Sequence, residues 1–396
     1  MKLLVFAHTP PPHHGQSYAV KLMLEKFGGN CRKQKPSPNS FGIECYHVNA
    51  RFSKTLEDIG EFQAGKILLI LFFCAQAVWC RFRYGVKNFY YVPAPGKPVA
   101  LYRDWLVMLV CRPFFKRVIL HWHAAGLAKW LETVGSMRTR SVTFNRMKNA
   151  DLSIVLSDFN RRDAEKLMAK KIAVVSGGIP DPCPRFAEEI LPRRRERIAL
   201  RKKILAGEIP VADGPAKIVN VLYVALVSRE KGVFDAIEGV ALANEKSPLP
   251  FRLTVIGGFA GAEEEKELRE FGAQRRFQNV VEILGFVSEE RKLQALRDAD
   301  IFCFPTYYSA ENQPGNLIEA MAFGLPMVTT RWRSIPEMLP ENFPGVVEPK
   351  SPAQIAEKLQ LLAAEDFSGQ LRERFLSRFT LEQHLGKMAE AIRSVE

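Results

Sequence analysis

The sequence lacks the cysteine spacing of a disulfide framework or of a metal site. Its 396 residues include seven cysteines, and these do not form the closely spaced pairs that bind metals. Several lie inside apolar segments, which predicts reduced, mostly buried thiols and a cytoplasmic protein. The first residues, 1–8, form a short apolar strand that runs into a Pro/His loop, so we expect no signal peptide there.

The sequence also lacks an apolar run of the roughly 20 residues that a membrane-spanning helix needs. The best candidate is the segment 67–79, with Lys66 before it and Arg81 and Arg83 after it. This segment is either a core helix, which we favour, or a helix that lies at a bilayer surface with its arginines among the headgroups. A second apolar and basic segment, 102–117, leaves open whether the protein is peripheral at the inner face of a membrane.

Acidic residues are scarce in the first half of the chain. Residues 1–200 contain 32 Lys and Arg against 15 Asp and Glu, whereas residues 201–396 contain 24 against 28, within a total net charge of +13. A basic half attracts an anionic membrane surface, nucleic acid or an acidic substrate, but an ordinary solvated surface gives the same count. Charge alone therefore leaves the partner open.

The chain also lacks the Gly-x-Gly-x-x-Gly fingerprint of dinucleotide-binding proteins, which argues against a nicotinamide oxidoreductase. The loop after the first expected strand, 9–17, contains one glycine, Gly15. A glycine at the start of a helix lets a ligand approach the backbone, and the helix N-terminus behind it suits an anion.

Strand-like and helix-like segments alternate along most of the chain, which predicts an α/β protein with parallel sheets covered by helices on both faces. Two such series predict two doubly wound, Rossmann-like domains with a cleft between them. We expect an N-terminal domain at 1–177, a basic interdomain linker at 178–216, a C-terminal domain at 217–378 and a C-terminal helix at 379–396 that packs back on the N-terminal domain. The expected strands are 3–7, 44–48, 89–92, 118–121, 153–156, 172–175, 218–225, 252–256, 280–284, 301–304 and 327–330.

The most informative segment, 305–326, contains two glutamates separated by seven residues, Glu311 and Glu319. An expected buried strand comes before them, and a small-residue helix carries the second. A helix N-terminus beside the carboxyl end of a strand offers free N–H groups and a positive dipole, which suit a phosphate. The glutamates are therefore either ordinary surface carboxylates or contacts to different parts of one ligand.

A lysine and a histidine follow two other expected strands. Lys231 lies just after the strand 218–225, where a lysine can meet a diphosphate as a point charge, although a Lys-Gly pair after a strand is common. His123 follows His121 with a spacing that puts both rings on one face of a strand. The neighbouring sequence supplies no cluster of Asp, Glu or Cys ligands, so we expect no metal and interpret a histidine here as a polar contact or a general base.

Taken together, these loops resemble the retaining glycosyltransferases of family 4, whose GT-B architecture has two facing Rossmann-like domains. The resemblance covers most of the chain. Its specific part is the Glu-x7-Glu element of Glu311 and Glu319, inside a Pro-Thr-Tyr-Tyr and Glu-Ala-Met-Ala-x-Gly-x-Pro pattern. The segment 300–305, the Lys-Gly pair at 231–232 and the turn at 176–180 agree with it.

The resemblance implies a hexosyltransferase-type enzyme of polysaccharide biosynthesis, with a nucleotide-diphosphate sugar donor, a glycan or lipid-linked acceptor, retention of anomeric configuration and no metal. It implies three catalytic residues. His123 would approach the anomeric region, Lys231 would neutralise the leaving diphosphate and Glu311 would orient sugar hydroxyls. Glu319 would accept hydrogen bonds from the ribose. The implied donor-binding residues are Gly15, Arg229, Lys231, Glu311, Asn312, Gln313, Pro314, Gly315, Asn316 and Glu319.

Two positions depart from the family pattern. The family places an arginine or asparagine shortly before the lysine, whereas this chain has Ala225, Leu226 and Val227 there, with Arg229 as the candidate replacement. The first loop has His-His-Gly where many members have Gly-Gly. The sequence leaves two alternatives: a nucleotide-sugar epimerase or hydrolase of the same fold, and a non-enzymatic binding protein for anionic lipid or nucleic acid. For a transferase we expect no nucleic-acid partner.

Overall fold

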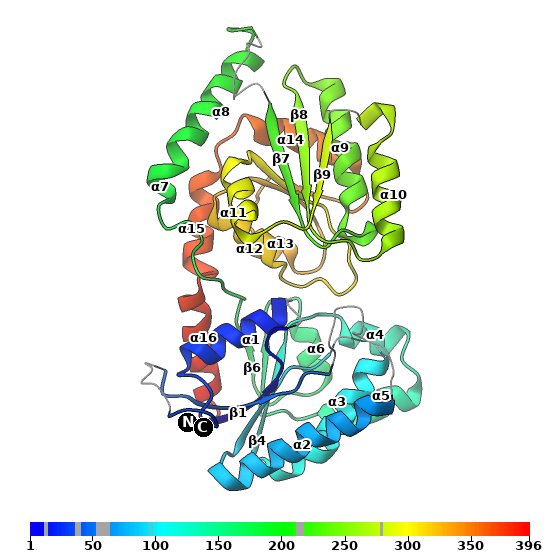
Figure 1. Ribbon diagram of the computed structural model, residues 1–396, viewed down its shortest axis with the longest axis vertical. Helices are drawn as coiled ribbons and strands as arrows, with labels where there is room; N and C mark the ends of the chain where they lie inside the picture. Colours follow the sequence, from blue (N-terminus) through cyan, green and yellow to red (C-terminus); the bar gives the residue numbers. More distant parts are fainter. Residues whose placement is uncertain are drawn as a thin grey trace. The chain divides into compact units, whose positions relative to one another are not determined.

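The computed structural model describes residues 1–11, 15–35, 41–52, 64–94, 96, 98–210, 218–277 and 280–396. It divides the chain into two compact α/β units (Figure 1). The first unit consists of Met1–Gly178 and Leu381–Glu396, and the second consists of Ile179–Thr380. Each unit has its own six-stranded parallel sheet, so the predicted fold class is confirmed.

The sheet of the first unit has the strand order β2-β1-β3-β4-β5-β6. Because side chains alternate along a strand, Leu3 and Val5 pack in one core cluster, whereas Leu4 and Phe6 pack in another on the opposite face. The strands are β1 (Lys2–Ala7), β2 (Glu44–Asn49), β3 (Asn88–Tyr91), β4 (Arg117–Trp122), β5 (Leu152–Val155) and β6 (Ile172–Val174).

Helices cover both faces of this sheet (Figure 1). Apolar residues of α1 (Gly15–Lys26) and α16 (Leu381–Arg393) belong to the cluster around Leu3, and those of α2 (Ala64–Tyr84) and α3 (Pro98–Cys111) belong to the cluster around Leu4. The remaining helices of the first unit are η1 (Arg112–Phe114), α4 (Leu127–Thr133), α5 (Met137–Met147) and α6 (Arg161–Lys166).

Helix α2 extends beyond the apolar segment 67–79 at both ends. Lys66 and Arg81 end the apolar segment, but a charged residue does not end a helix. Among the described residues, one helical stretch, Gly65–Tyr84, is long and apolar enough to cross a membrane by length and composition. The expectation that this segment is too short is therefore wrong by that criterion. Only 22% of its most apolar window is buried, so the core-helix interpretation holds for one face of α2 and not for the other.

The sheet of the second unit has the order β12-β11-β10-β7-β8-β9. From β7 the strands β10, β11 and β12 follow in one direction and β8 and β9 in the other, which is the doubly wound arrangement with its switch point between β7 and β10. Ligands of such sheets bind at the carboxyl ends of the two strands at the switch point. The strands are β7 (Val219–Val224), β8 (Phe251–Ile256), β9 (Val281–Gly285), β10 (Ile301–Phe304), β11 (Met327–Thr330) and β12 (Val346–Val347).

The segment predicted as a basic linker, 178–216, contains helices that pack in the second unit, while its residues 211–216 lie outside the described part. Arg201 is buried there, and its Nη2 donates to Asp300 Oδ2 at 2.6 Å. Arg201 and Arg194, which is also buried, are thus part of a core, whereas Arg195 and Lys202 of the same basic run are exposed. The helices of the second unit are α7 (Phe186–Glu189), α8 (Leu191–Leu205), η2 (Arg229–Lys231), α9 (Val233–Lys246), α10 (Ala262–Gly272), η3 (Arg275–Phe277), α11 (Glu289–Asp298), α12 (Gly315–Ala322), α13 (Ile335–Met338), α14 (Pro352–Ala363) and α15 (Ser368–Arg378).

All seven cysteines lie in the described part of the chain and all are free thiols. Six are buried, and Cys31 is partly exposed. Burial raises the pKa of the Cys31 and Cys183 thiols above the ordinary value. This agrees with the prediction of reduced, mostly buried cysteines.

Candidate functional site

The loops that follow β7 and β10 meet at the switch point of the second sheet. The backbone N–H of Tyr307 donates to the carbonyl of Glu230 at 2.8 Å, and Thr306 Oγ1 donates to the same carbonyl at 3.3 Å. The close approach depends on Gly232, whose φ is +80°. A Cβ at this position would lie 2.2 Å from the carbonyl oxygen of Pro305. The glycine after Lys231 is therefore required by packing between the two loops.

This junction brings Lys231 and Glu311 together. Lys231 Nζ lies 2.5 Å from Glu311 Oε2, and both side chains are mostly buried. Thr306 Oγ1 donates to the same carboxylate oxygen at 3.3 Å, and the Lys231 ammonium lies 4.5 Å from the ring centroid of Tyr308. Burial and the nearby Glu311 carboxylate raise the pKa of Tyr308 above its ordinary value. A fixed cation and a fixed carboxylate thus lie side by side at the carboxyl ends of β7 and β10.

Helix α12 begins directly after this loop. Pro314 is its N-cap residue and makes no side-chain cap hydrogen bond, and the first turn contains no acidic residue. A Cβ at Gly315 would meet no atom within 4 Å. The start of α12 thus has no hydrogen bond from an N-cap side chain, although the Leu317 N–H of its first turn donates to Asn316 Oδ1 at 2.8 Å, and such a helix N-terminus favours an anion.

Two asparagines hold the start of α12 in place. Asn316 Nδ2 donates to the carbonyl of Val224 at 2.8 Å, which ties the helix to the end of β7. Asn312 is buried, and its Oδ1 accepts a hydrogen bond from Ser334 Oγ at 2.9 Å. These contacts give both asparagines a positioning role in the loop. Gln313 and Pro314 lie between the two asparagines along the chain, and Pro314 is the residue just before α12.

Glu319 lies one turn into α12 and pairs with Lys292 of α11. Lys292 Nζ lies 2.8 Å from Glu319 Oε1 and 3.1 Å from Glu289 Oε1. Burial acts to lower the pKa of Lys292, but the two carboxylates outweigh it and hold that pKa above its ordinary value. Sequence reasoning missed Lys292, because no local pattern on α11 marks a contact 27 residues away.

Arg229 contacts neither Lys231 nor Glu311 among the interactions that the structure defines for it. Its guanidinium pairs with Glu267 of α10 and lies 4.2 Å from the ring centroid of Phe234. The prediction that Arg229 replaces a missing diphosphate contact therefore stays a prediction, and that contact would require the side chain to leave Glu267.

Gly15 and His123 belong to the first unit, and each follows the carboxyl end of a strand. Gly15 begins α1 after β1, while the neighbouring Pro12, His13 and His14 lie outside the described residues. The ring of His123 lies 4.2 Å from the ring of His121, as expected for residues on one face of a strand. Their predicted roles toward a ligand of the second unit stay predictions.

His121 is buried, and its Nδ1 lies 2.5 Å from Tyr90 Oη. Burial lowers the pKa of His121 well below its ordinary value, and His123 and His384 act in the same direction. Among the described residues there is no group of three or more His, Cys, Asp or Glu side chains that could hold a metal ion.

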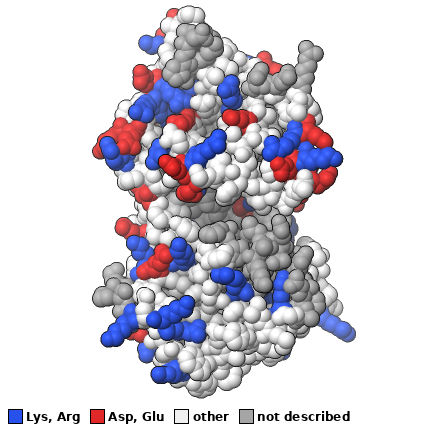
Figure 2. Space-filling view, in the orientation of Figure 1, with Lys and Arg blue, Asp and Glu red and all other residues white. Residues whose placement is uncertain are grey.

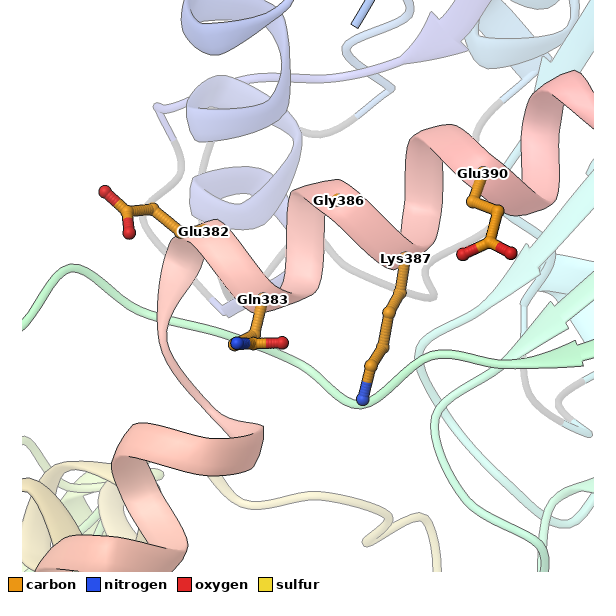
Figure 3. A pocket seen from close by; sticks show the side chains of 5 residues that line it. All are labelled: Glu382, Gln383, Gly386, Lys387 and Glu390. Atoms are coloured by element: carbon orange, nitrogen blue, oxygen red, sulfur yellow. The ribbon is translucent and has the colours of Figure 1, made fainter.

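A surface pocket lies along α16 of the first unit (Figure 3). The side chains of Gln383, Lys387 and Glu390 extend from the same side of the helix, and Glu382 extends from another. None of these residues belongs to the predicted site.

The chain matches the family model "Glycosyl transferases group 1" over residues 214–378. It is 31% identical over 150 residues to the amylovoran biosynthesis glycosyltransferase AmsK of Erwinia amylovora. The aligned residues cover 37% of this chain and 36% of AmsK. It is also 31% identical over 157 residues to the putative colanic acid biosynthesis glycosyltransferase WcaL of Escherichia coli, with 38% of each chain covered. The chain thus matches a little over a third of the length of these curated relatives.

Among solved structures, Anabaena HepE in complex with UDP-glucose is similar over 99% of both chains, with a TM-score of 0.64 and 15% identity. At 15% identity this is a similarity of fold alone, and it extends over both units and their two parallel sheets. Residues 214–378 are thus similar to the glycosyl transferases group 1 family, and the fold with its two six-stranded parallel sheets is similar to that of HepE.

Proposed function

We propose that the protein transfers a sugar from a nucleotide-diphosphate donor to a glycan or lipid-linked acceptor in polysaccharide biosynthesis, with retention of anomeric configuration. The observation that carries this proposal is the contact of Lys231 with Glu311 at the β7–β10 switch point, beside the start of α12. A sugar diphosphate needs a cation and backbone N–H donors for its phosphates and a carboxylate for its hydroxyls. The second unit offers all three within one loop junction.

The chemistry of the transfer follows from these charges. When the bond between the anomeric carbon and the diphosphate oxygen breaks, negative charge develops on the leaving diphosphate. The Lys231 ammonium and the N–H groups at the start of α12 stabilise that charge, so the proposed mechanism uses no metal. Glu311 holds the ammonium in place through their contact and accepts hydrogen bonds from sugar hydroxyls when the donor is bound.

Glu319 supplies the nucleoside contact in this proposal. It lies one turn beyond the start of α12, so it meets the ribose while the helix start meets the diphosphate. The complex of HepE with UDP-glucose supports a UDP-sugar as the donor. The seven free cysteines support a cytoplasmic location, where thiols stay reduced.

Calorimetry with UDP, UDP-glucose and a panel of other nucleotide sugars tests the proposal. We expect the wild-type protein to bind at least one nucleotide sugar, and we expect Glu348→Gln, which removes a surface ion pair with Arg331, to bind it equally. If the protein binds no nucleotide sugar and no nucleoside diphosphate, the proposal is wrong.

Incubation with the bound donor then separates transfer from the two other reactions of the same fold. A transferase consumes the donor only when an acceptor fraction, such as lipid-linked glycan, is added. Epimerisation or hydrolysis of the donor at an equal rate without acceptor would identify an epimerase or a hydrolase instead.

A further inference from the structure

The outward face of α2 carries large apolar side chains from Ile67 to Phe82. Leu68, Phe72, Trp79 and Phe82 are 73%, 57%, 51% and 68% exposed. Their spacing puts them on one stripe of the helix, and Ile67 and Leu71 beside them are also exposed. Single exposed apolar residues are ordinary, but a continuous stripe of large ones marks an interaction surface.

The opposite face of α2 has a different partner. Ile70, Cys74, Ala77 and Cys80 are buried in the core cluster that also contains Leu4 of β1. Packing on the sheet thus accounts for one stripe of the helix and leaves the outward stripe unexplained. Because its inner face is already packed, α2 cannot span a bilayer in this fold, but it can lie along the surface of one.

The apolar stripe continues beyond the helix. Phe114 of η1 is 41% exposed, and its ring lies 6.0 Å from the ring of Phe82. Arg81 Nε donates to the carbonyl of Phe114 at 2.9 Å, and its guanidinium lies 5.8 Å from the Phe82 ring. Aromatic rings with an arginine at their edge are typical of the boundary between lipid chains and headgroups.

The sequence that contains this stripe carries charge of almost one sign, although Glu44 of β2 lies near the C-terminal end of α2 through Tyr46, whose ring contacts Tyr84. Residues 64–131 contain ten basic side chains and a single acidic one, Asp104. Asp104 is fully buried, where it accepts hydrogen bonds from Tyr91 Oη at 2.6 Å and from the backbone of Ala94 at 2.8 Å. No residue from 64 to 131 therefore exposes a carboxylate. The basic residues are Lys66, Arg81, Arg83, Lys87, Lys97, Arg103, Arg112, Lys116, Arg117 and Lys129.

The space-filling view agrees with this charge pattern. Where Figure 1 shows α2, Figure 2 shows a largely uncharged area with blue side chains near it and no red ones among the described residues of that area. An apolar stripe inside a basic surrounding is complementary to a bilayer that contains anionic lipid, because the stripe enters the acyl boundary and the cations meet the headgroups. A second copy of the chain would bring the same positive surroundings against each other.

We propose that the outward face of α2, formed by Leu68, Phe72, Trp79 and Phe82 and continued by Phe114 of η1, docks on the surface of a bilayer that contains anionic lipid. The helix lies parallel to the bilayer plane, with its outward stripe at the acyl boundary. This surface is independent of the proposed transfer site, which lies in the second unit.

Flotation with vesicles tests the proposal on the full chain. The wild type is expected to float with vesicles of phosphatidylcholine and phosphatidylglycerol, and to float less with phosphatidylcholine alone or at high salt. The variant Phe72→Ser/Trp79→Gln/Phe82→Ser is expected to lose about tenfold or more of its partitioning. Phe286→Ser, which removes a highly exposed phenylalanine of the second unit, is the matched control and is expected to float like the wild type.

Quenching by bromine-labelled lipid locates the contact. The tryptophan fluorescence of the wild type is expected to be quenched by brominated phosphatidylglycerol vesicles, and Trp79→Phe is expected to remove most of that quenching without loss of flotation. Circular dichroism and calorimetry with the donor check that each variant is folded and still binds nucleotide, so a failure here differs from a failure of the proposed function.

Three outcomes would overturn the proposal. The first is a wild type that stays in the soluble fraction with anionic vesicles. The second is quenching that persists unchanged in Trp79→Phe. The third is concentration-dependent dimerisation in light scattering that the triple variant abolishes, because the stripe would then be a contact between two copies of the chain.

Discussion

Lys292 Nζ lies 2.8 Å from Glu319 Oε1 and joins α11 to α12 in the second unit. The lysine is mostly buried, so it is part of the structure that holds the glutamate and not a loose surface charge. The contact with the Lys292 ammonium limits the rotation of the Glu319 carboxylate. A carboxylate held in one orientation can accept hydrogen bonds from two neighbouring hydroxyl groups.

We therefore predict that Lys292 and Glu319 act together in nucleotide binding. Glu319→Ala is expected to weaken the binding of UDP by about 10- to 100-fold, because charge-assisted hydrogen bonds are lost. Lys292→Met is expected to weaken it by a smaller factor, since the carboxylate remains but is no longer held. Lys358→Met, which removes a lysine of similar exposure paired with Glu357 on α14, is the control. Calorimetry measures the dissociation constants; equal binding by Glu319→Ala and the wild type would contradict the assignment.

Lys231 is predicted to act on turnover more than on binding. Lys231→Met is expected to lower kcat by about 10²- to 10³-fold, because the removed charge acts mainly where the leaving diphosphate gains negative charge. The value of KM for the donor is expected to change less, since the start of α12 is intact. Arg229→Met is the comparison, because Arg229 is engaged with Glu267.

Steady-state kinetics with donor and acceptor distinguish the two positions. If Arg229→Met lowers kcat as strongly as Lys231→Met does, Arg229 leaves Glu267 to reach the diphosphate, and the expectation from the sequence that it replaces the missing contact is correct. If Lys231→Met raises KM and leaves kcat unchanged, Lys231 contributes binding alone.

Much of the fold could be predicted because its signals are local. The apolar run at 301–304 is β10 at the same bounds. β12 was missed because it has two residues and exists through its pairing with β11. Gly345 allows that pairing, since a Cβ there would lie 1.9 Å from the carbonyl oxygen of Met327.

The candidate site was predictable to the extent that it follows from strand ends. Lys231 and Glu311 follow β7 and β10, and the strand order then brings these two loops together. Lys292 was not predictable in this way, because its partner Glu319 lies on another helix. The exposed stripe of α2 was not predictable either, since an apolar sequence does not show which of its faces the sheet covers. Contacts between elements thus carried the information that local patterns lacked.

Gly232 is predicted to tolerate no side chain. Gly232→Ala introduces a Cβ that would lie 2.2 Å from the carbonyl oxygen of Pro305, at a φ of +80° that an alanine rarely adopts. We expect a loss of about 1–3 kcal/mol in the free energy of unfolding of the second unit and a lower kcat, because the loop of Lys231 shifts. Gly258→Ala is the control, since a Cβ there would meet no atom within 4 Å. Urea unfolding that is equal in both variants would contradict the packing argument.

The first unit is predicted to lose stability in mild acid, because several of its histidines are buried in the neutral form, and His47 is one of them. His47 is buried, with Nε2 2.8 Å from the carbonyl oxygen of Ala7. Burial lowers its pKa from 6.5 to about 4; the hydrogen bond to Ala7 opposes this shift, and Arg32 and Lys33 add to it. Between pH 6.5 and about 4 the unfolded state therefore binds a proton that the folded state does not bind. The free energy of unfolding is at its full value above pH 6.5 and falls by up to about 1.4 kcal/mol for each pH unit below it.

Urea unfolding at a series of pH values between 7.5 and 4.5 measures this slope. His47→Gln is expected to reduce it, because the glutamine amide can donate to the Ala7 carbonyl and does not titrate. His121 and His384, whose pKa values are also lowered by burial, leave a residual slope in that variant. Asn145→Gln, which changes an exposed, non-titrating side chain of the same unit, is the control and is expected to keep the wild-type slope. A slope that is the same in His47→Gln and in the wild type would show that His47 takes up its proton in the folded protein. That result would contradict the prediction, because burial and the nearby Arg32 disfavour a charged His47 ring.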